Sequence, residues 1–105
     1  MKAPLPPNEP ERLAALRRYG VLDTAPEAAF DELTQLAAYI CEAPIALITL
    51  IDEDRQWFKS KIGLNAAETA RDVAFCAHAL HQADLCIVPD ATQDSRFADN
   101  PFVTR

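Results

Sequence analysis

The run Ile45–Ile51 is the feature that most constrains the fold of this chain. Apart from Thr49, every residue in it is Ile, Leu or Ala, and no polar residue alternates with the apolar ones. Such a run predicts a β-strand that is covered on both faces. A short polar link over residues 52–55 follows, so the next strand is expected to return antiparallel as a hairpin.

The second strand of this hairpin alternates in character. Lys59 and Lys61 are expected to point outward, and outward lysines are typical of an edge strand, where they prevent pairing with strands of other molecules. The alternation predicts one face formed by Phe58, Ser60 and Ile62 and another formed by Trp57, Lys59 and Lys61.

Two helices are predicted before the hairpin. Residues 1–7 are proline-rich and are expected to be a flexible lead-in. Asn8 with Glu11 forms a capping-box pattern that begins the first helix, and Gly20 is a signal for its end. A second capping box, Thr24 with Glu27, begins a helix expected over Ala25–Glu42. Its apolar stripe, away from Asp31, Glu32 and Gln35, consists of Phe30, Leu33, Leu36, Ala37, Ile40 and Cys41.

Less regular structure is predicted for the part of the chain after the hairpin. Residues 63–72 are expected to be irregular, 75–82 helical, and 85–88 a short strand closed by Pro89. Asp94 is expected to cap a helical turn over residues 95–98. The fold class is therefore α+β, with an antiparallel sheet and flanking helices rather than a doubly wound sheet. Three strands leave one edge of Ile45–Ile51 without a partner, so the sheet is expected to be incomplete and finished by further chain or by a second copy.

Composition excludes several classes of protein. Half of the 105 residues are hydrophobic, too many for a disordered chain, and the net charge of −6 disfavours binding to nucleic acid. No apolar run is long enough to enter a membrane, and no secretory signal is present, so we expect a soluble cytoplasmic domain. Three cysteines without a C-x-x-C spacing predict neither disulfides nor structural zinc.

Reactive side chains are few. Cys76 and His78 form the most reactive-looking pair, but residues two apart point to different sides of a helix, so plain packing or a place in a ligand wall is favoured over catalysis. His78 and His81 are expected to be solvated or hydrogen-bonded rather than metal ligands. Trp57 and Phe58 either line a ligand cavity, or one of them fills the core while the other covers a sheet edge. Arg71 either orients the loop before the helix or forms a surface ion pair with Asp72.

Several stretches taken together resemble the first part of a GAF domain, of the type found in bacterial sensor histidine kinases and diguanylate cyclases. The resemblance begins near Glu9 and continues almost to the last residue. The stretches that carry it are Leu22–Glu27, Phe30, Asp31, Pro44–Ile48, Asp52, Arg55–Ser60, Gly63, Leu64, Glu68, Thr69, Arg71, Phe75–Ala79, Val88–Thr92, Asp94–Phe97, Asn100, Pro101 and Val103.

This resemblance implies that residues 8–105 are the N-terminal part of a single GAF domain that lacks its central strands. It implies a regulatory sensor that binds a small ligand, forms a homodimer, and controls an output domain such as a histidine kinase or a diguanylate cyclase. The first helix is the expected dimer and signalling element, and no cofactor is specified. Candidate ligand-binding residues are Phe75, Cys76, His78, Trp57 and Arg71, with no catalytic or metal-ligating residue.

Two alternatives remain open at this point. One is a thiol-dependent enzyme of GAF fold, similar to methionine sulfoxide reductases, that uses Cys76 or Cys86. The other is a dimerisation module with no ligand.

Overall fold

The hairpin predicted from the sequence is the centre of the sheet. The computed structural model describes residues 2–81, 85 and 87–104. Strands β1 (Ala46–Ile51), β2 (Arg55–Ile62) and β3 (Glu68–Ala70) form an antiparallel sheet in the order β1-β2-β3. Within the described residues, one edge of β1 has no neighbouring strand. The α+β class and the open edge of the first strand are therefore confirmed.

Two expectations about the sheet are wrong. The sequence predicts an irregular segment over residues 63–72, but residues 68–70 form β3, which makes β2 a central strand instead of an edge strand. The expected strand at 85–88 is absent among the residues described there, where Leu85 and Ile87 are 78% and 72% exposed, and Cys86 lies outside the described residues. Residues 68–70 form a strand because they pair with residues 55–57 of β2. Such pairing cannot be read from local β-propensity.

A β-bulge changes which side chains face which way. Ile48 pairs with Ser60 and Thr49 with Phe58, so Lys59 is the extra residue of β2. As a result Lys59 and Ser60 both contact the segment around α2, and strict alternation fails. The expectation that Lys59 points outward is wrong, because the residue is only 4% exposed.

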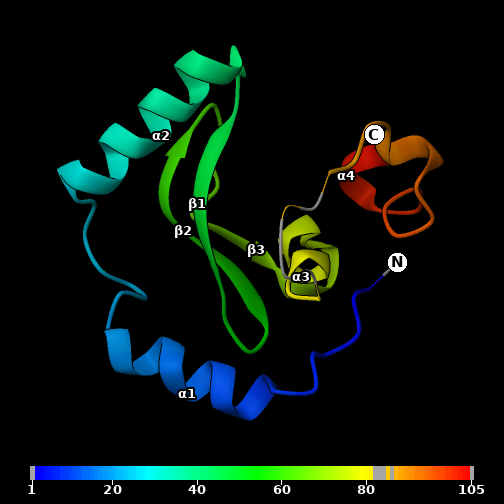
Figure 1. The fold of residues 1–105 in the computed structure, drawn as a ribbon, viewed down its shortest axis with the longest axis horizontal. Helices are drawn as coiled ribbons and strands as arrows, with labels where there is room; N and C mark the ends of the chain where they lie inside the picture. Colours follow the sequence, from blue (N-terminus) through cyan, green and yellow to red (C-terminus); the bar gives the residue numbers. More distant parts are fainter. Residues whose placement is uncertain (1, 82–84, 86, 105) are drawn as a thin grey trace.

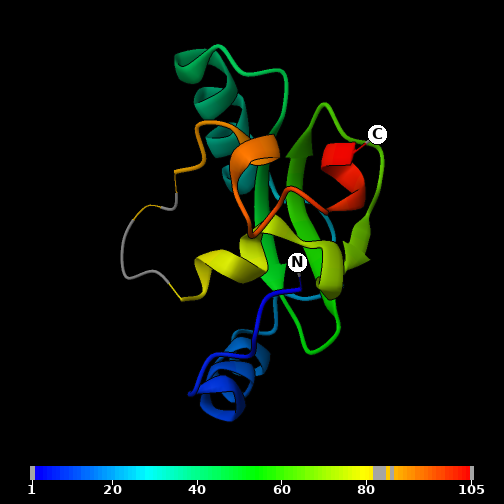
Figure 2. The same ribbon diagram turned by 90° about the vertical axis from the view of Figure 1, so that its right-hand side faces the viewer.

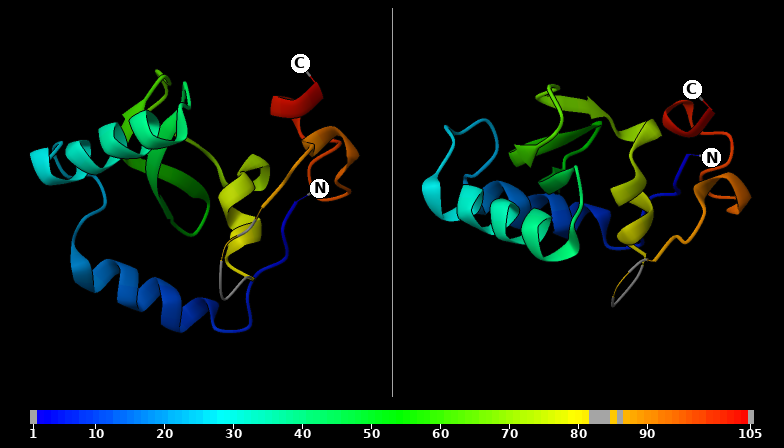
Figure 3. Two further views of the ribbon diagram at one scale, coloured as in Figure 1. Left: turned by 45° about the horizontal axis from the view of Figure 1, so that its top comes forward. Right: turned by 90° about the horizontal axis from the view of Figure 1, so that it is seen from above.

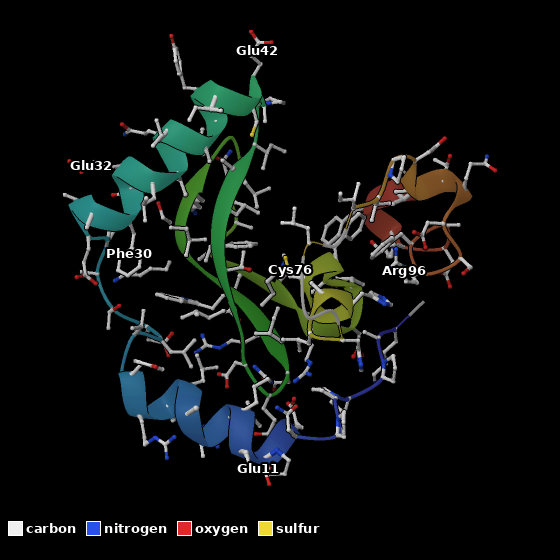
Figure 4. The ribbon with its side chains drawn as sticks, viewed as in Figure 1. Glu11, Phe30, Glu32, Glu42, Cys76 and Arg96 are labelled. Atoms are coloured by element: carbon white, nitrogen blue, oxygen red, sulfur yellow. The ribbon has the colours of Figure 1, made fainter. Side chains whose placement is uncertain are left out.

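Helix α1 (Glu9–Tyr19) ends as predicted at Gly20, whose φ of 62° is left-handed. Neither capping box forms. The side chain of Asn8 makes no cap hydrogen bond, and Glu11 points away from the sheet into solvent (Figure 4). Thr24 donates to the carbonyl of Val21 instead of capping α2.

Helix α2 (Ala28–Cys41) packs on one face of the sheet, but not through the predicted apolar stripe. Thr34 is 2% exposed against the sheet, whereas Leu33, Leu36 and Ile40 are 58%, 53% and 67% exposed. The physical reason is a polar contact with the bulge. The Ser60 hydroxyl donates to Asp31 Oδ1 at 2.6 Å and lies 2.8 Å from Thr34 Oγ1.

The opposite face of the sheet carries the short elements that follow β3. These are η1 (Arg71–Val73), α3 (Phe75–Ala79), η2 (Ala91–Gln93) and α4 (Pro101–Thr104). Figure 1 shows α2 on one side of the strands and α3 and α4 on the other, with α1 beyond the turn of the hairpin. Figure 2 shows α3 and α4 over the sheet with α2 behind it, and both views of Figure 3 place α4 on the side of α3 away from α2. The predicted helix at 75–82 is thus confirmed for residues 75–79.

Gly63 holds the two ends of the hairpin close together. It follows β2 with a φ of 80°, and a Cβ there would lie 2.1 Å from the carbonyl oxygen of Pro44. Any other residue would push the start of β1 away from the end of β2.

Candidate functional site

A cavity of about 400 Å³ lies over the sheet on the face opposite α2. Strand residues form its floor, and η1, α3 and α4 supply its walls. It is the most apolar of the described cavities, and no charged side chain lines it. The lining residues are Ile45, Leu47, Gln56, Phe58, Leu64, Ala66, Thr69, Val73, Phe75, Cys76 and Phe102.

Gln56 is the one extended polar side chain on this floor. It lies on the central strand β2, is 7% exposed, and donates from Nε2 to Thr69 Oγ1 of β3 at 3.1 Å. Its Oε1 is buried and accepts no hydrogen bond from any described residue. Buried acceptors nearly always have a partner, so this one is a marked exception.

The wall at α3 is held by the segment that follows it. The Phe75 ring stacks on Phe97 with centroids 4.4 Å apart, and Phe97 is 1% exposed. Asn100 Nδ2 donates to the carbonyl of Val73 at 2.8 Å. Residues 97–100 therefore fix the position of η1 and of the first turn of α3, both of which line the cavity.

The five residues predicted as ligand-binding do not all gather at one place. Phe75 and Cys76 line this cavity, and Figure 4 shows Cys76 between α3 and the sheet. Trp57 lines a different cavity, on the α2 side of the sheet. His78 is 6% exposed with its ring edge against Phe97 at 4.8 Å between centroids.

Arg71, the fifth predicted residue, lies at the start of η1 in a buried ion pair with Glu9 of α1. Nη1 of Arg71 is 2.5 Å from Glu9 Oε2 and 3.0 Å from the carbonyl oxygen of Asp52. Arg12 also binds Glu9, and its Nη1 donates to the carbonyl of Ile51 at 2.6 Å. Hydrogen bonds from Arg71 and then Arg12 lower the pKa of Glu9 from 4.5 to about 2. The pair ties α1 to the hairpin and to the cavity wall.

A third arginine, Arg55, organises the outer end of the hairpin. Arg55 binds Asp23, Asp52 and Glu68 with N···O distances of 2.7, 3.2 and 3.1 Å. The contact with Arg55 lowers the pKa of the exposed Asp23 carboxyl. These ion pairs attach the segment before α2 to β2 and β3, and none of the residues lines the sheet cavity.

The described residues provide no alternative inorganic site. Across residues 2–81, 85 and 87–104, no three His, Cys, Asp or Glu side chains gather closely enough to hold a metal ion. In the same part of the chain, every helix is too short or too polar to cross a lipid bilayer. The candidate ligand site is the cavity over the sheet, because its wall is apolar and its floor holds one extended polar side chain.

Sequence reasoning misses most of the cavity floor. Phe58 is one of the residues that the sequence offers for a ligand cavity, but Gln56 is not, although it lies two residues earlier on the same face of β2. Thr69 is missed because β3 is not predicted. The floor is recognisable only once the three strands are paired.

Comparison with known proteins gives two matches. The GAF domain family matches residues 25–105. A cyclic di-GMP phosphodiesterase of Pseudomonas aeruginosa is 40% identical over 100 residues, which cover 95% of this chain and 17% of the length of that relative.

Proposed function

The chain belongs to the GAF domain family, and on that premise we propose that it is a cytoplasmic sensor module of a bacterial signal-transduction protein. It binds a small molecule in the cavity over the sheet and passes the resulting change to an output domain. The observation that carries this proposal is the apolar cavity itself, whose floor holds a buried carboxamide with a free acceptor. Ligand sites in proteins are characteristically apolar with a few placed polar groups.

The output we propose is an enzyme domain that acts on cyclic di-GMP. The relative described above is a cyclic di-GMP phosphodiesterase, and this chain spans 17% of its length. This likeness favours a cyclic di-GMP enzyme over a histidine kinase as the controlled domain. Ligand binding then shifts the balance between two arrangements of the sensor and its flanking helices.

We propose that the module has no catalysis of its own. Cys76 lines the cavity, whereas the ring of His78 packs against Phe97, so thiol and imidazole have different neighbours. A cysteine nucleophile needs its base within hydrogen-bond reach. The thiol enzyme alternative would therefore need a second group near Cys76, and Cys86 lies outside the described residues.

Native mass spectrometry of the purified chain tests the binding function. The chain is incubated with a small-molecule extract of bacterial cells and is expected to retain a compound. Ala66→Trp fills the cavity mouth from an exposed lining position and is expected to abolish retention. Ala14→Trp, on the exposed side of α1, is the matched control and should retain the compound as the wild type does. Retention that is equal in all three proteins, or absent from the wild type, would contradict the proposal.

Self-association is a second role favoured by one observation. Leu33, Leu36, Tyr39 and Ile40 leave an apolar surface on α2 that is 53–81% exposed. Exposed patches of this kind mark interaction surfaces. A homodimer through α2 predicts concentration-dependent sedimentation that is lost in Leu36→Gln/Ile40→Gln, whereas a monomer at all concentrations would contradict it.

A further inference from the structure

We propose that the cavity over the sheet selects an uncharged aromatic compound with one N–H or O–H donor, which Gln56 recognises. This inference rests on the proposed function, since it requires the cavity to be the ligand site. It adds to that function the chemical class of the ligand and the residue that recognises the ligand.

The wall chemistry favours an aromatic ligand. Phe58 from β2, Phe75 from α3 and Phe102 from α4 reach the cavity from three different elements. Aromatic rings pair favourably in stacked and edge-to-face arrangements, which a flat ring between these side chains can adopt.

The same wall disfavours a charged ligand. None of the side chains that line the cavity is Lys, Arg, His, Asp or Glu. An ion entering it would lose its hydration without gaining a counter-charge, and unpaired buried charges are strongly unfavourable. Cyclic di-GMP carries two anionic phosphodiester groups, so we expect the compound named by the relative not to be the ligand of this cavity.

Gln56 supplies the specificity. Nε2 donates to Thr69 Oγ1, whereas Oε1 is the atom without a partner, and an amide oxygen can only accept a hydrogen bond. Because Oε1 is buried, a ligand reaches it only if the carboxamide turns about its soft terminal torsion, and this rotation strains the hydrogen bond from Nε2 to Thr69 Oγ1. A donor on the ligand would satisfy the orphaned oxygen, whereas a ligand without a donor would keep it unpaired.

Indole and benzofuran form a matched pair of probes. They have the same bicyclic shape, but only indole carries an N–H donor. NMR titration of the ¹⁵N-labelled chain is expected to give a dissociation constant about tenfold lower for indole than for benzofuran, which corresponds to about 1.4 kcal/mol. Gln56→Leu is expected to bind the two compounds equally, because its side chain offers no acceptor.

Two further probes complete the test. Indole-3-acetate, which adds a carboxylate, is expected to bind more weakly than indole. Cyclic di-GMP is expected not to displace bound indole. Equal affinity for indole and benzofuran in the wild-type chain would overturn the proposal, and so would tighter binding of indole-3-acetate. Because the two compounds are compared in the wild-type chain, the comparison does not depend on the folding of Gln56→Leu.

The two proposals can fail separately. A retained compound that is sensitive to Ala66→Trp but is charged, or lacks a donor, would overturn the ligand class and leave the sensor function standing. Absence of any retained compound would overturn the sensor function itself.

Discussion

Glu9 in the first turn of α1 and Arg71 at the start of η1 are joined by a buried ion pair, although 62 residues separate them in the chain. Both are less than 9% exposed. Glu9 precedes the segment that matches the GAF family, and Arg71 lies inside it beside the cavity wall. The pair is therefore a physical connection between an N-terminal helix and the candidate ligand site.

This connection predicts loss of stability in acid. The pKa of Glu9 is lowered from 4.5 to about 2 by hydrogen bonds from Arg71 and Arg12. A carboxyl with a lowered folded-state pKa stabilises the fold above pH 4.5, and this contribution disappears as the pH falls toward 2. The contribution at neutral pH is on the order of 3 kcal/mol. Urea unfolding followed from pH 7 down to pH 2 measures this loss.

Glu9→Gln and Glu11→Gln separate this effect from general acid unfolding. Glu9→Gln should lower the free energy of unfolding at pH 7 and flatten its pH dependence. Glu11 is exposed on the same helix, so Glu11→Gln should behave as the wild type does. An unchanged pH dependence in Glu9→Gln would show that the ion pair contributes nothing.

Lys59 and Lys61 form a second matched comparison. The Lys59 ammonium is buried, at 2.7 Å from Thr24 Oγ1, 2.6 Å from the Ala25 carbonyl oxygen and 2.7 Å from Glu27 Oε2. Lys59→Met leaves all three groups without this donor and should destabilise the fold by about 1–3 kcal/mol. Lys61 is exposed, so Lys61→Met should cost less than about 1 kcal/mol. Thermal unfolding of both variants checks the contrast, which equal costs would refute.

Lys59 also marks the limit of what the sequence reveals about the fold. Strand alternation predicts the existence, direction and approximate limits of β1 and β2, because a strongly apolar run followed by a short polar link has few other solutions. It places Lys59 in solvent because a bulge leaves no signal in one sequence. The buried lysine, the Asp31–Ser60 contact and the exposed Leu33 all follow from that single extra residue.

The candidate site is predictable only in part. Phe75 and Cys76 belong to a segment whose helix the sequence predicts, and they line the cavity. Gln56 and Thr69 are neighbours through the pairing of β2 with β3, a three-residue strand too short and polar to be recognised. Arg71 belongs to the right segment, but its partner Glu9 is a long-range contact that no local pattern reveals.

Phe97 is expected to support the cavity wall from behind. It is 1% exposed and stacks on Phe75. Phe97→Ala should destabilise the fold by about 3–5 kcal/mol, and Phe97→Leu by less because most of the volume is kept. Indole titration of Phe97→Leu should show weaker binding than the wild type, since the Phe75 ring loses its stacking partner. Undiminished affinity in a folded Phe97→Leu would contradict a role for this stack.

The thiols report on occupancy of the cavity. In a Cys86→Ser background, the exposed Cys41 should react faster with a thiol reagent than Cys76, which is partly buried in the cavity wall. Indole at saturating concentration should slow the reaction of Cys76 and leave that of Cys41 unchanged. Mass spectrometry of the labelled peptides follows each site, and equal protection of both would indicate a global effect instead of a local one.

Chemical-shift mapping of the ¹⁵N-labelled chain with indole locates the ligand with the fewest assumptions. We expect the largest amide shifts on the floor and walls of the cavity, at Gln56, Phe58, Thr69, Phe75 and Cys76, while those of exposed α2 residues such as Glu32 stay unchanged. Shifts confined to the α2 side of the sheet, around Trp57 and Thr34, would contradict binding in the cavity over the sheet.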